Sequence, residues 1–370
     1  MSRKLGFLQI LRGLAALLVV ADHALYYAAD KAPLPAWQEN LAWSLGTLGV
    51  DIFFVISGFI MIYTSSDLFG MPSGSGKFAY RRIARIVPMY WLATAVEMSL
   101  AYRRGSLPGA DRVFSSLFFI PEVTDPGQPL RPVLGVGWTL NYEMFFYVLF
   151  TAALVFRRRL GVLLLITSLI ALVVAGSLVK PLLDTADPTT VLTFLCDPII
   201  LLFAAGAGLG IAAEQAVKRG LKLRHAGLVS VALLIFCGVL FVTAIGRTPW
   251  PLAWQAVFWL TCVAIAACAA LAADGAPSAI RAGLEKLGDA SYSIYLFHFI
   301  AIAGFGRLWQ RVSEDFDRLP FLGLAFVVAT AVGVLIHLAV ERPLLLSLRH
   351  LRPRLSRVFA GAITRPKTPS

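Results

Sequence analysis

Long apolar stretches separated by short polar segments run through most of the chain. An α-helix needs about 20 apolar residues to cross the hydrocarbon core of a bilayer, because each residue adds about 1.5 Å. The pattern predicts about ten helices of this kind. They span roughly residues 7–28, 42–64, 86–102, 137–156, 160–179, 191–213, 225–245, 252–273, 290–309 and 319–340. We therefore expect an all-α membrane bundle, with one transmembrane domain over residues 1–345 and a short basic tail over residues 346–370.

The composition agrees with a membrane protein and argues against an ordinary soluble domain. Hydrophobic residues make up 58% of the chain, charged residues only 15%, and the mean hydropathy is +0.76. A surface that faces water needs a larger share of charged residues than this. The cysteines all fall in apolar stretches and show neither a CxxC pair nor a ligand spacing with histidine. We therefore expect no metal site.

The basic residues cluster in the segments between the apolar stretches. A net charge of +12 is compatible with a nucleic-acid partner. Membrane topology explains the charge better, because with a cytoplasmic N-terminus the inner segments carry about twice as many Lys and Arg residues as the outer ones. We therefore expect both termini in the cytoplasm, the basic tail on anionic lipid, and no nucleic-acid partner.

Ionisable side chains inside the predicted helices are the candidates for function. Such residues are unfavourable in a bilayer, so they usually face a partner, a cavity or a substrate path. They are Arg12, Asp22, His23, Asp51, Glu97, Glu143, Asp197, His298 and His337. Arg12 and His23 lie on nearly the same face of one helix, about 16 Å apart along its axis. We expect them to line one side of a channel, with Arg12 nearer the cytoplasm, where it would contact a long ligand such as acyl-CoA.

Two acidic residues, Asp51 and Glu143, are expected at a depth similar to that of His23. Each lies about 10 Å from the outer end of its predicted helix. A neutral imidazole that is oriented by a carboxylate is a competent general base for a sugar hydroxyl that attacks a thioester. The sequence therefore predicts His23, Asp51 and Glu143 as catalytic residues, and either carboxylate could orient the imidazole. The alternative is that the carboxylates only neutralise Arg12 or cap helix ends.

Two further groups of residues suggest a site for coenzyme A. Arg81, Arg82 and Arg85 open the third predicted helix, and guanidinium groups bind phosphate well. Fixing the membrane topology is the alternative role for these arginines. The second predicted helix contains the small-residue group Ser57, Gly58 and Phe59. This group allows close approach by a pantetheine-like chain, although helix packing explains it equally well.

Several longer motifs occur in order between Leu11 and Pro343. They are LRGLAALLVVADH, GVDIFFVISGFIM, RRIARIVPMYW, GWTLNYEMFFY, SYSIYLFH and ERP. Together they resemble the acyltransferase-3 family of membrane O-acyltransferases, and WTLNYEMFFY is similar to the exopolysaccharide acetyltransferase branch. The combination is far more specific than any single motif.

The resemblance implies a domain of about ten helices in the bacterial plasma (inner) membrane. Such a domain takes an acetyl or similar acyl group from cytoplasmic acyl-CoA, such as acetyl-CoA, and transfers it to a hydroxyl of an extracytoplasmic glycan. The acceptor would be an exopolysaccharide or a lipid-linked precursor, in association with polysaccharide synthesis or export machinery. By position, His23 matches the family's essential histidine, Arg12 its partnered arginine and Glu143 its acidic residue.

Other matches to the family carry further expectations. The arginines of the third predicted helix match its acyl-CoA motif, and Ser57–Phe59 match its second-helix motif. His298 also matches a motif, but eight residues into an ascending helix we expect it nearer the cytoplasm and away from His23. A glycan transporter or exporter without acyl transfer is the alternative function, although the chain shows no evident internal repeat. The acceptor, the acyl group and the choice between direct transfer and an acyl-enzyme stay open.

Overall fold

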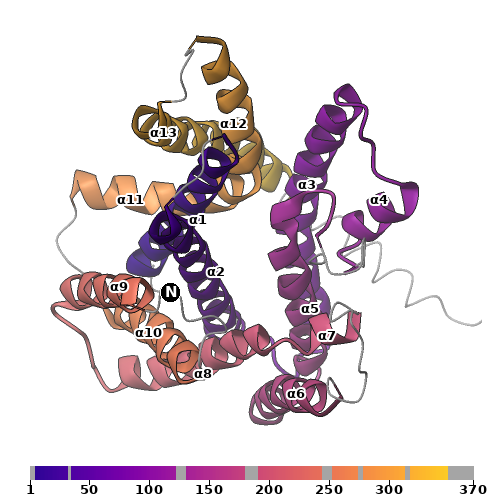
Figure 1. Cartoon of the computed structure of the whole chain (residues 1–370). Coiled ribbons are helices and arrows are strands. Elements are labelled where there is room, and N and C mark those ends of the chain that lie inside the picture. The colour runs from indigo at the N-terminus through magenta and orange to yellow at the C-terminus, as the bar shows by residue number, and fades with distance from the viewer. Residues whose placement is uncertain are drawn as a thin grey trace, which may run out of the picture.

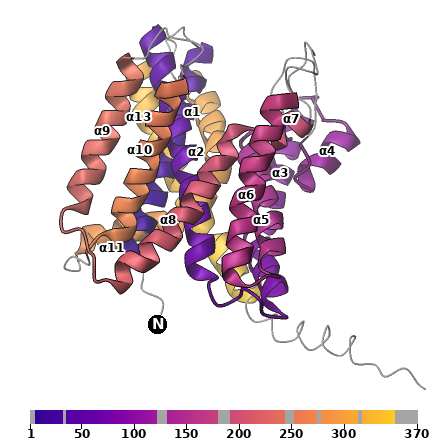
Figure 2. The same ribbon diagram turned by 90° about the horizontal axis from the view of Figure 1, so that it is seen from below.

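The structure is a computed structural model that describes residues 5–31, 35–121, 131–179, 191–243, 252–273, 278–312 and 317–348. These residues form a bundle of α-helices (Figure 1 and Figure 2). The longer helices are α1 (Gly6–Lys31), α2 (Ala36–Thr64), α3 (Gly74–Arg103), α5 (Trp138–Ala153), α6 (Arg158–Val179), α8 (Leu201–Lys218), α9 (Ala226–Thr243), α10 (Leu252–Leu271), α12 (Ser291–Val312) and α13 (Arg318–Ile336). The shorter ones are α4 (Ala110–Leu117), α7 (Val191–Leu195), α11 (Ala279–Asp289) and a π-helical turn after α13 (His337–Glu341).

A long helix occupies most of each stretch that the hydrophobic pattern predicts. Within the described residues, 6 helices are long and apolar enough to cross a membrane. They are Gly6–Lys31, Trp37–Thr64, Arg158–Val179, Pro198–Lys218, Trp254–Leu271 and Arg318–Leu348. The all-α class is confirmed, whereas about ten membrane crossings and the cytoplasmic termini stay predictions. The predicted tail lies outside the described residues from position 349 onward.

α1 and α2 run through the centre of the bundle, with α3–α6, α8–α10 and α11–α13 arranged around them (Figure 1). Glycines let the central helices approach their neighbours closely. A Cβ at Gly49 would lie 2.6 Å from the carbonyl oxygen of Ala15, and one at Gly58 would lie 2.2 Å from that of Phe203. No side chain fits at such distances, so α2 packs backbone to backbone against both α1 and α8.

The end of α11, just before α12 begins, packs against α1 well beyond the first turn of α1. A Cβ at Gly13 would lie 3.0 Å from the nitrogen of Gly288, and one at Gly288 would lie 1.9 Å from the carbonyl oxygen of Gln9. α11 occupies the space beside the first turn of α1, where Glu285 approaches Gly6. α12 therefore begins roughly 10 Å further along the bundle than α1 does.

Candidate functional site

Two cavities meet inside the bundle, because Arg12, Arg82 and Arg85 line both of them. The first, which we name the basic cavity, is also lined by Arg81, Asp289, His337, Glu341 and Arg342. Its arginines outnumber its carboxylates, so it suits an anionic ligand. The second, which we name the central cavity, has about 760 Å³ of empty space among α2, α3, α5 and α12.

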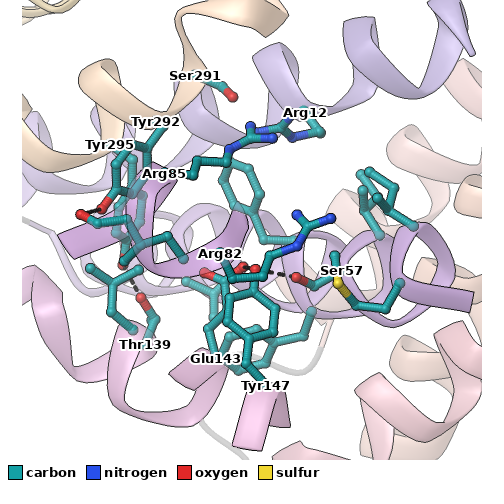
Figure 3. Close-up of a pocket in the computed structure, with 18 residues that line it drawn as sticks. Arg12, Ser57, Arg82, Arg85, Thr139, Glu143, Tyr147, Ser291, Tyr292 and Tyr295 are labelled. Atoms are coloured by element: carbon teal, nitrogen blue, oxygen red, sulfur yellow. Dashed lines mark hydrogen bonds between the residues drawn. The ribbon is translucent and has the colours of Figure 1, made fainter. Parts of the chain in front are cut away.

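The polar groups of the central cavity come from several helices (Figure 3). They are Arg12 of α1, Ser57 of α2, Arg82 and Arg85 of α3, Thr139, Glu143 and Tyr147 of α5, and Ser291, Tyr292 and Tyr295 of α12. The α5 residues follow one another at intervals of four positions, which puts them on one face of the helix. Phe53, Phe54 and other apolar side chains complete the wall. A long ligand with both polar and apolar parts fits this lining.

Aromatic rings hold Arg82 at the junction of the two cavities. Its guanidinium carbon lies 5.4 Å from the centre of the Phe78 ring and 5.7 Å from the centre of the Tyr147 ring. These cation–π contacts orient the guanidinium plane. Its Nε atom is buried and has no hydrogen-bond partner among the described residues. A buried donor without a partner is unfavourable, so Arg82 is suited to bind an oxygen of a ligand.

Glu143 lies in the central cavity, away from the position where it would orient His23. Ser57 Oγ donates a hydrogen bond of 2.9 Å to Glu143 Oε1, and the Tyr147 hydroxyl donates to the same oxygen. The carboxylate beside the imidazole is that of Asp22, with 3.5 Å between His23 Nδ1 and Asp22 Oδ2. The depth of Glu143 along α5 therefore does not show which residues it contacts, because the face of α5 that carries Glu143 turns toward α2 and α3.

Asp51 also faces away from His23. It precedes Gly58 by seven residues, so it lies on nearly the same face of α2, which packs against α8 and α10. Cys262 of α10 is one of its neighbours. Both carboxyl oxygens of Asp51 are buried, and the Trp259 side chain of α10 is another of its neighbours. The structure thus brings neither of the predicted carboxylates to the imidazole.

The residues Ser57, Gly58 and Phe59 point in different directions. Ser57 lines the central cavity, whereas Gly58 packs against α8 and Phe59 is buried with its ring stacked on that of Tyr63. Successive residues of a helix turn by about 100°, so three in a row cannot face one ligand. The predicted donor contact is therefore not supported for Gly58 and Phe59, and helix packing explains both. Ser57 stays a candidate for contact with a ligand.

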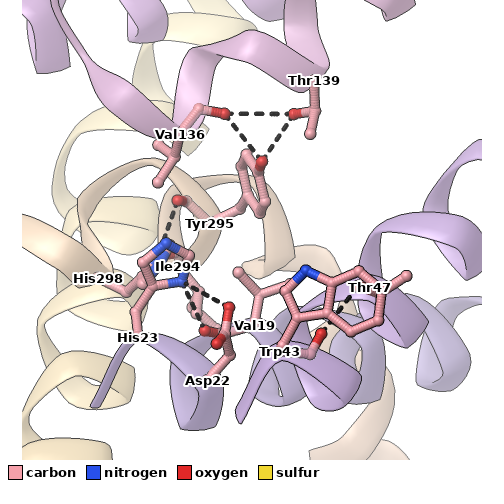
Figure 4. A network of polar contacts seen from close by, with 10 residues as sticks. All are labelled: Val19, Asp22, His23, Trp43, Thr47, Val136, Thr139, Ile294, Tyr295 and His298. Atoms are coloured by element: carbon pink, nitrogen blue, oxygen red, sulfur yellow. Dashed lines mark hydrogen bonds and ion pairs between the residues drawn. The ribbon is translucent and has the colours of Figure 1, made fainter. Parts of the chain in front are cut away.

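His23 and His298 form a pair of contacting rings (Figure 4). Their centres are 4.8 Å apart, and their planes are nearly perpendicular at 72°. The expectation that His298 lies away from His23 is therefore wrong. Gly13 meets Gly288 just before the start of α12, and each histidine lies about 15 Å beyond that contact on its own helix. The error came from assuming that both helices begin at the same level.

Backbone carbonyl groups indicate the tautomer of both rings. His23 Nδ1 lies 3.0 Å from the oxygen of Val19, and His298 Nδ1 lies 2.7 Å from the oxygen of Tyr295. We assign the ring hydrogen to Nδ1 in each case, because a carbonyl oxygen can only accept. The Nε2 atom of each neutral ring is then a proton acceptor, and in His298 it is buried without a partner among the described residues. Either imidazole is therefore able to act as a base.

Tyr295 separates the central cavity from this imidazole pair. It lines the cavity, and its ring centre lies 5.9 Å from that of His298. Its hydroxyl donates to the Val136 carbonyl oxygen at 2.9 Å and lies 2.7 Å from Thr139 Oγ1 (Figure 4). His23 is absent from the described lining of both cavities. Tyr295 is therefore one of the side chains between the central cavity and the imidazole pair.

Comparison with known proteins decides the family. Residues 5–338 match the acyltransferase-3 family, whose description is acyltransferase domain, and this range includes both imidazoles and the arginines of α1 and α3. The chain belongs to the acyltransferase-3 family. Since it also has apolar helices of membrane-crossing length, this acyltransferase-3 protein is a membrane acyltransferase. No solved structure matches it.

The relatives of this acyltransferase-3 protein match it over nearly their whole length. It is 34% identical over 342 residues to the exopolysaccharide production protein ExoZ of Rhizobium meliloti (strain 1021), covering 91% of this chain and 98% of the relative. The acyltransferase MdmB of Streptomyces mycarofaciens is 26% identical, with 93% and 92% covered. Nodulation protein 10 of Rhizobium leguminosarum bv. viciae is 27% identical, with 86% and 90% covered.

Proposed function

We propose that this protein transfers an acyl group, most simply acetyl, from cytoplasmic acyl-CoA to a glycan hydroxyl at the outer face of the bacterial plasma membrane. The observation that carries the proposal is the succession of basic cavity, central cavity and imidazole pair along the bundle. Acetyl-CoA has the matching order of groups, with phosphates at one end and a thioester at the other. The exopolysaccharide production named for one relative supports an exopolysaccharide or a lipid-linked precursor as acceptor.

The length of acyl-CoA suits the separation of the arginines from the imidazoles. Arg12 and His23 lie about 16 Å apart along the axis of α1. The pantetheine arm has about twelve bonds between phosphate and sulfur, which reach roughly 14 Å at the rise per bond of an extended peptide. Phosphates bound by Arg12, Arg82 and Arg85 would therefore bring the thioester to the depth of His23. Arg81, which lines only the basic cavity, is placed to add charge for the remaining phosphate.

In the proposed reaction, His23 acts as a general base. Its Nε2 takes the proton of the acceptor hydroxyl while the hydroxyl oxygen attacks the thioester carbonyl. The tetrahedral intermediate then loses the thiolate as the C–S bond breaks, and the imidazolium returns its proton to the sulfur. The products are the O-acyl ester and free coenzyme A. We favour this direct route over an acyl-imidazole, because it needs one acyl transfer instead of two. The acceptor can meet the imidazole, since 26% of the His23 side chain is exposed.

Other residues have supporting parts in the proposal. His298 fixes the position of the His23 ring through their contact. Glu143 belongs to the donor side, where it holds Ser57 and offsets part of the arginine charge. Asp51 has no part in the transfer, because it faces α8 and α10. We propose no metal in the reaction, because the imidazole moves the proton and the thiolate is itself a good leaving group.

Transfer of labelled acetyl groups by the purified, membrane-reconstituted protein tests the proposal. Radiolabelled acetyl-CoA and polysaccharide isolated from a strain that lacks the protein are supplied as substrates. We expect label on the glycan, an O-acetyl ester in its NMR spectrum, and one coenzyme A released per ester. A glycan transporter would instead move the polysaccharide across the membrane without labelling it, and this outcome would overturn the proposal.

A further inference from the structure

We infer that the first turn of α12, with Ser291, is a phosphate site that holds the pyrophosphate of the donor together with Arg12. The inference rests on the proposed function, because it assigns one part of acyl-CoA to one part of the cavities. The anionic end of the donor would then be bound by the N-terminus of α12 as well as by the arginines of α3.

α12 begins inside the protein. α11 ends at Asp289 and α12 starts at Ser291, where Ala290 and Ser291 are 1% and 0% exposed. The first N–H groups of a helix have no acceptor within the helix and carry a partial positive charge. A buried helix start therefore needs acceptors from elsewhere, and phosphate oxygens are well suited to this place.

Ser291 gives an independent indication of a ligand. Its side chain is buried and lines the central cavity, yet its Oγ has no hydrogen-bond partner among the residues that the structure describes. A buried hydroxyl in this state is unfavourable unless a molecule in the cavity binds it. In Figure 3 this hydroxyl lies on the same side of the cavity as the Arg12 guanidinium. Ser293 of the same turn differs, since it donates to Glu341 Oε2 at 2.7 Å.

The arginines of α3 converge on the same region. The Tyr292 hydroxyl donates to the carbonyl oxygen of Ile86 at 2.8 Å. This bond fixes the first turn of α12 beside the turn of α3 that carries Arg82 and Arg85. The buried Nε of Arg82 also lacks a partner within the described chain. Donors from α3 and α12 therefore line one cavity, whose acidic residue, Glu143, already accepts hydrogen bonds from Ser57 and Tyr147 through Oε1.

The acidic residues nearby are bound by other donors. Glu341 Oε2 accepts from Ser293 and also lies 2.8 Å from His337 Nδ1. Asp289 Oδ1 accepts from Gln9 Nε2 at 2.7 Å. Because these contacts satisfy the carboxylates, the helix start and the guanidinium groups are left for an external anion.

The distance from this site to the imidazoles fits the same molecule. Ser291 and His298 lie about 10 Å apart along α12. A phosphate oxygen that accepts from the helix start adds about 3 Å. The sum agrees with the roughly 14 Å reach of an extended pantetheine arm. A free phosphate or a lipid headgroup shares the phosphate chemistry, but the arm is what connects this site with the imidazole pair.

Binding and transfer by Ser291 variants of the full-length protein in nanodiscs test the site. Ser291→Ala removes the hydroxyl, and we expect the Kd for coenzyme A and for 3′-dephospho-CoA to rise about tenfold. Ser291→Asp adds a negative charge, and we expect a rise of at least about 100-fold. Aspartate is favoured at a helix start, so this variant should keep its thermal stability. The control is Ser44→Ala, a buried serine of α2 that bonds the Asn40 carbonyl, and its Kd should not change.

Truncated ligands identify which group Ser291 contacts. The kcat/KM for acetyl-pantetheine, a donor without phosphates, should be the same in Ser291→Ala and wild type, and inorganic pyrophosphate should compete with coenzyme A more weakly in the variant. An equal loss with acetyl-pantetheine would overturn the phosphate site. Unchanged coenzyme A affinity in both Ser291 variants, with Arg82→Ala impaired, would overturn it and leave the proposed function standing. A wild type that binds no coenzyme A would refute the proposed function as well.

Discussion

Replacing Arg82 with lysine keeps the positive charge at the junction of the two cavities and removes the planar guanidinium. In the structure the guanidinium carbon lies 5.4 and 5.7 Å from the ring centres of Phe78 and Tyr147. Arginine can give a phosphate two parallel hydrogen bonds, whereas lysine binds as a point charge. Loss of one charge-assisted bond weakens binding by about 1.5 kcal/mol, and loss of the ring contacts by about another 0.5 kcal/mol.

We therefore expect Arg82→Lys to weaken coenzyme A binding by about 2 kcal/mol, which corresponds to about 30-fold in Kd. Arg81 provides the matched control, because it is the preceding residue on α3 but is exposed and lines only the basic cavity. Arg81→Lys should change Kd by less than about fivefold, as expected for an exposed charge that is retained. Equilibrium binding of labelled coenzyme A at one fixed salt concentration measures both. Equal effects of the two substitutions would refute the assigned role of Arg82.

Two further predictions concern the imidazole pair and the packing of α2. His298→Gln should lower the rate of acetyl transfer about 100-fold or more, while coenzyme A affinity stays within about threefold, because the ring contacts His23 and lies beyond the donor's phosphates. Gly206→Ala should lower the thermal unfolding temperature in detergent, because its Cβ would lie 2.1 Å from the Val55 carbonyl oxygen, and overpacking of this kind costs about 1–3 kcal/mol. Gly208→Ala on the same helix meets nothing within 4 Å and should leave that temperature unchanged.

The positions of the helices could be predicted because an apolar run of membrane-crossing length is a direct signal in the sequence. The basic cluster could be predicted for a similar reason, since Arg81, Arg82 and Arg85 are close in sequence and lie close in space. Arg12 lines the same cavity, in agreement with its predicted position near the beginning of the first helix. Predicting these features requires only the positions of the residues along the chain.

The surroundings of His23 could not be predicted, because they depend on how each helix is rotated and where it begins. Asp51 has a suitable depth but lies on the α8 face of α2, and Glu143 points into the central cavity. His298 reaches His23 because α11 makes α12 start further along α1. The contact between Tyr295 and His298 could have been predicted from the sequence, because residues three positions apart lie on the same face of a helix.

Acetyl transfer by His23→Ala tests the central claim most directly. The variant is reconstituted beside wild type, and labelled ester on isolated polysaccharide is measured together with coenzyme A binding. Loss of the general base should lower transfer by at least about 100-fold and up to about 10,000-fold. Coenzyme A affinity should stay at the wild-type value, since the arginines that bind its phosphates lie about 16 Å away along α1. Transfer at the wild-type rate by a correctly inserted His23→Ala protein would contradict the role of this imidazole.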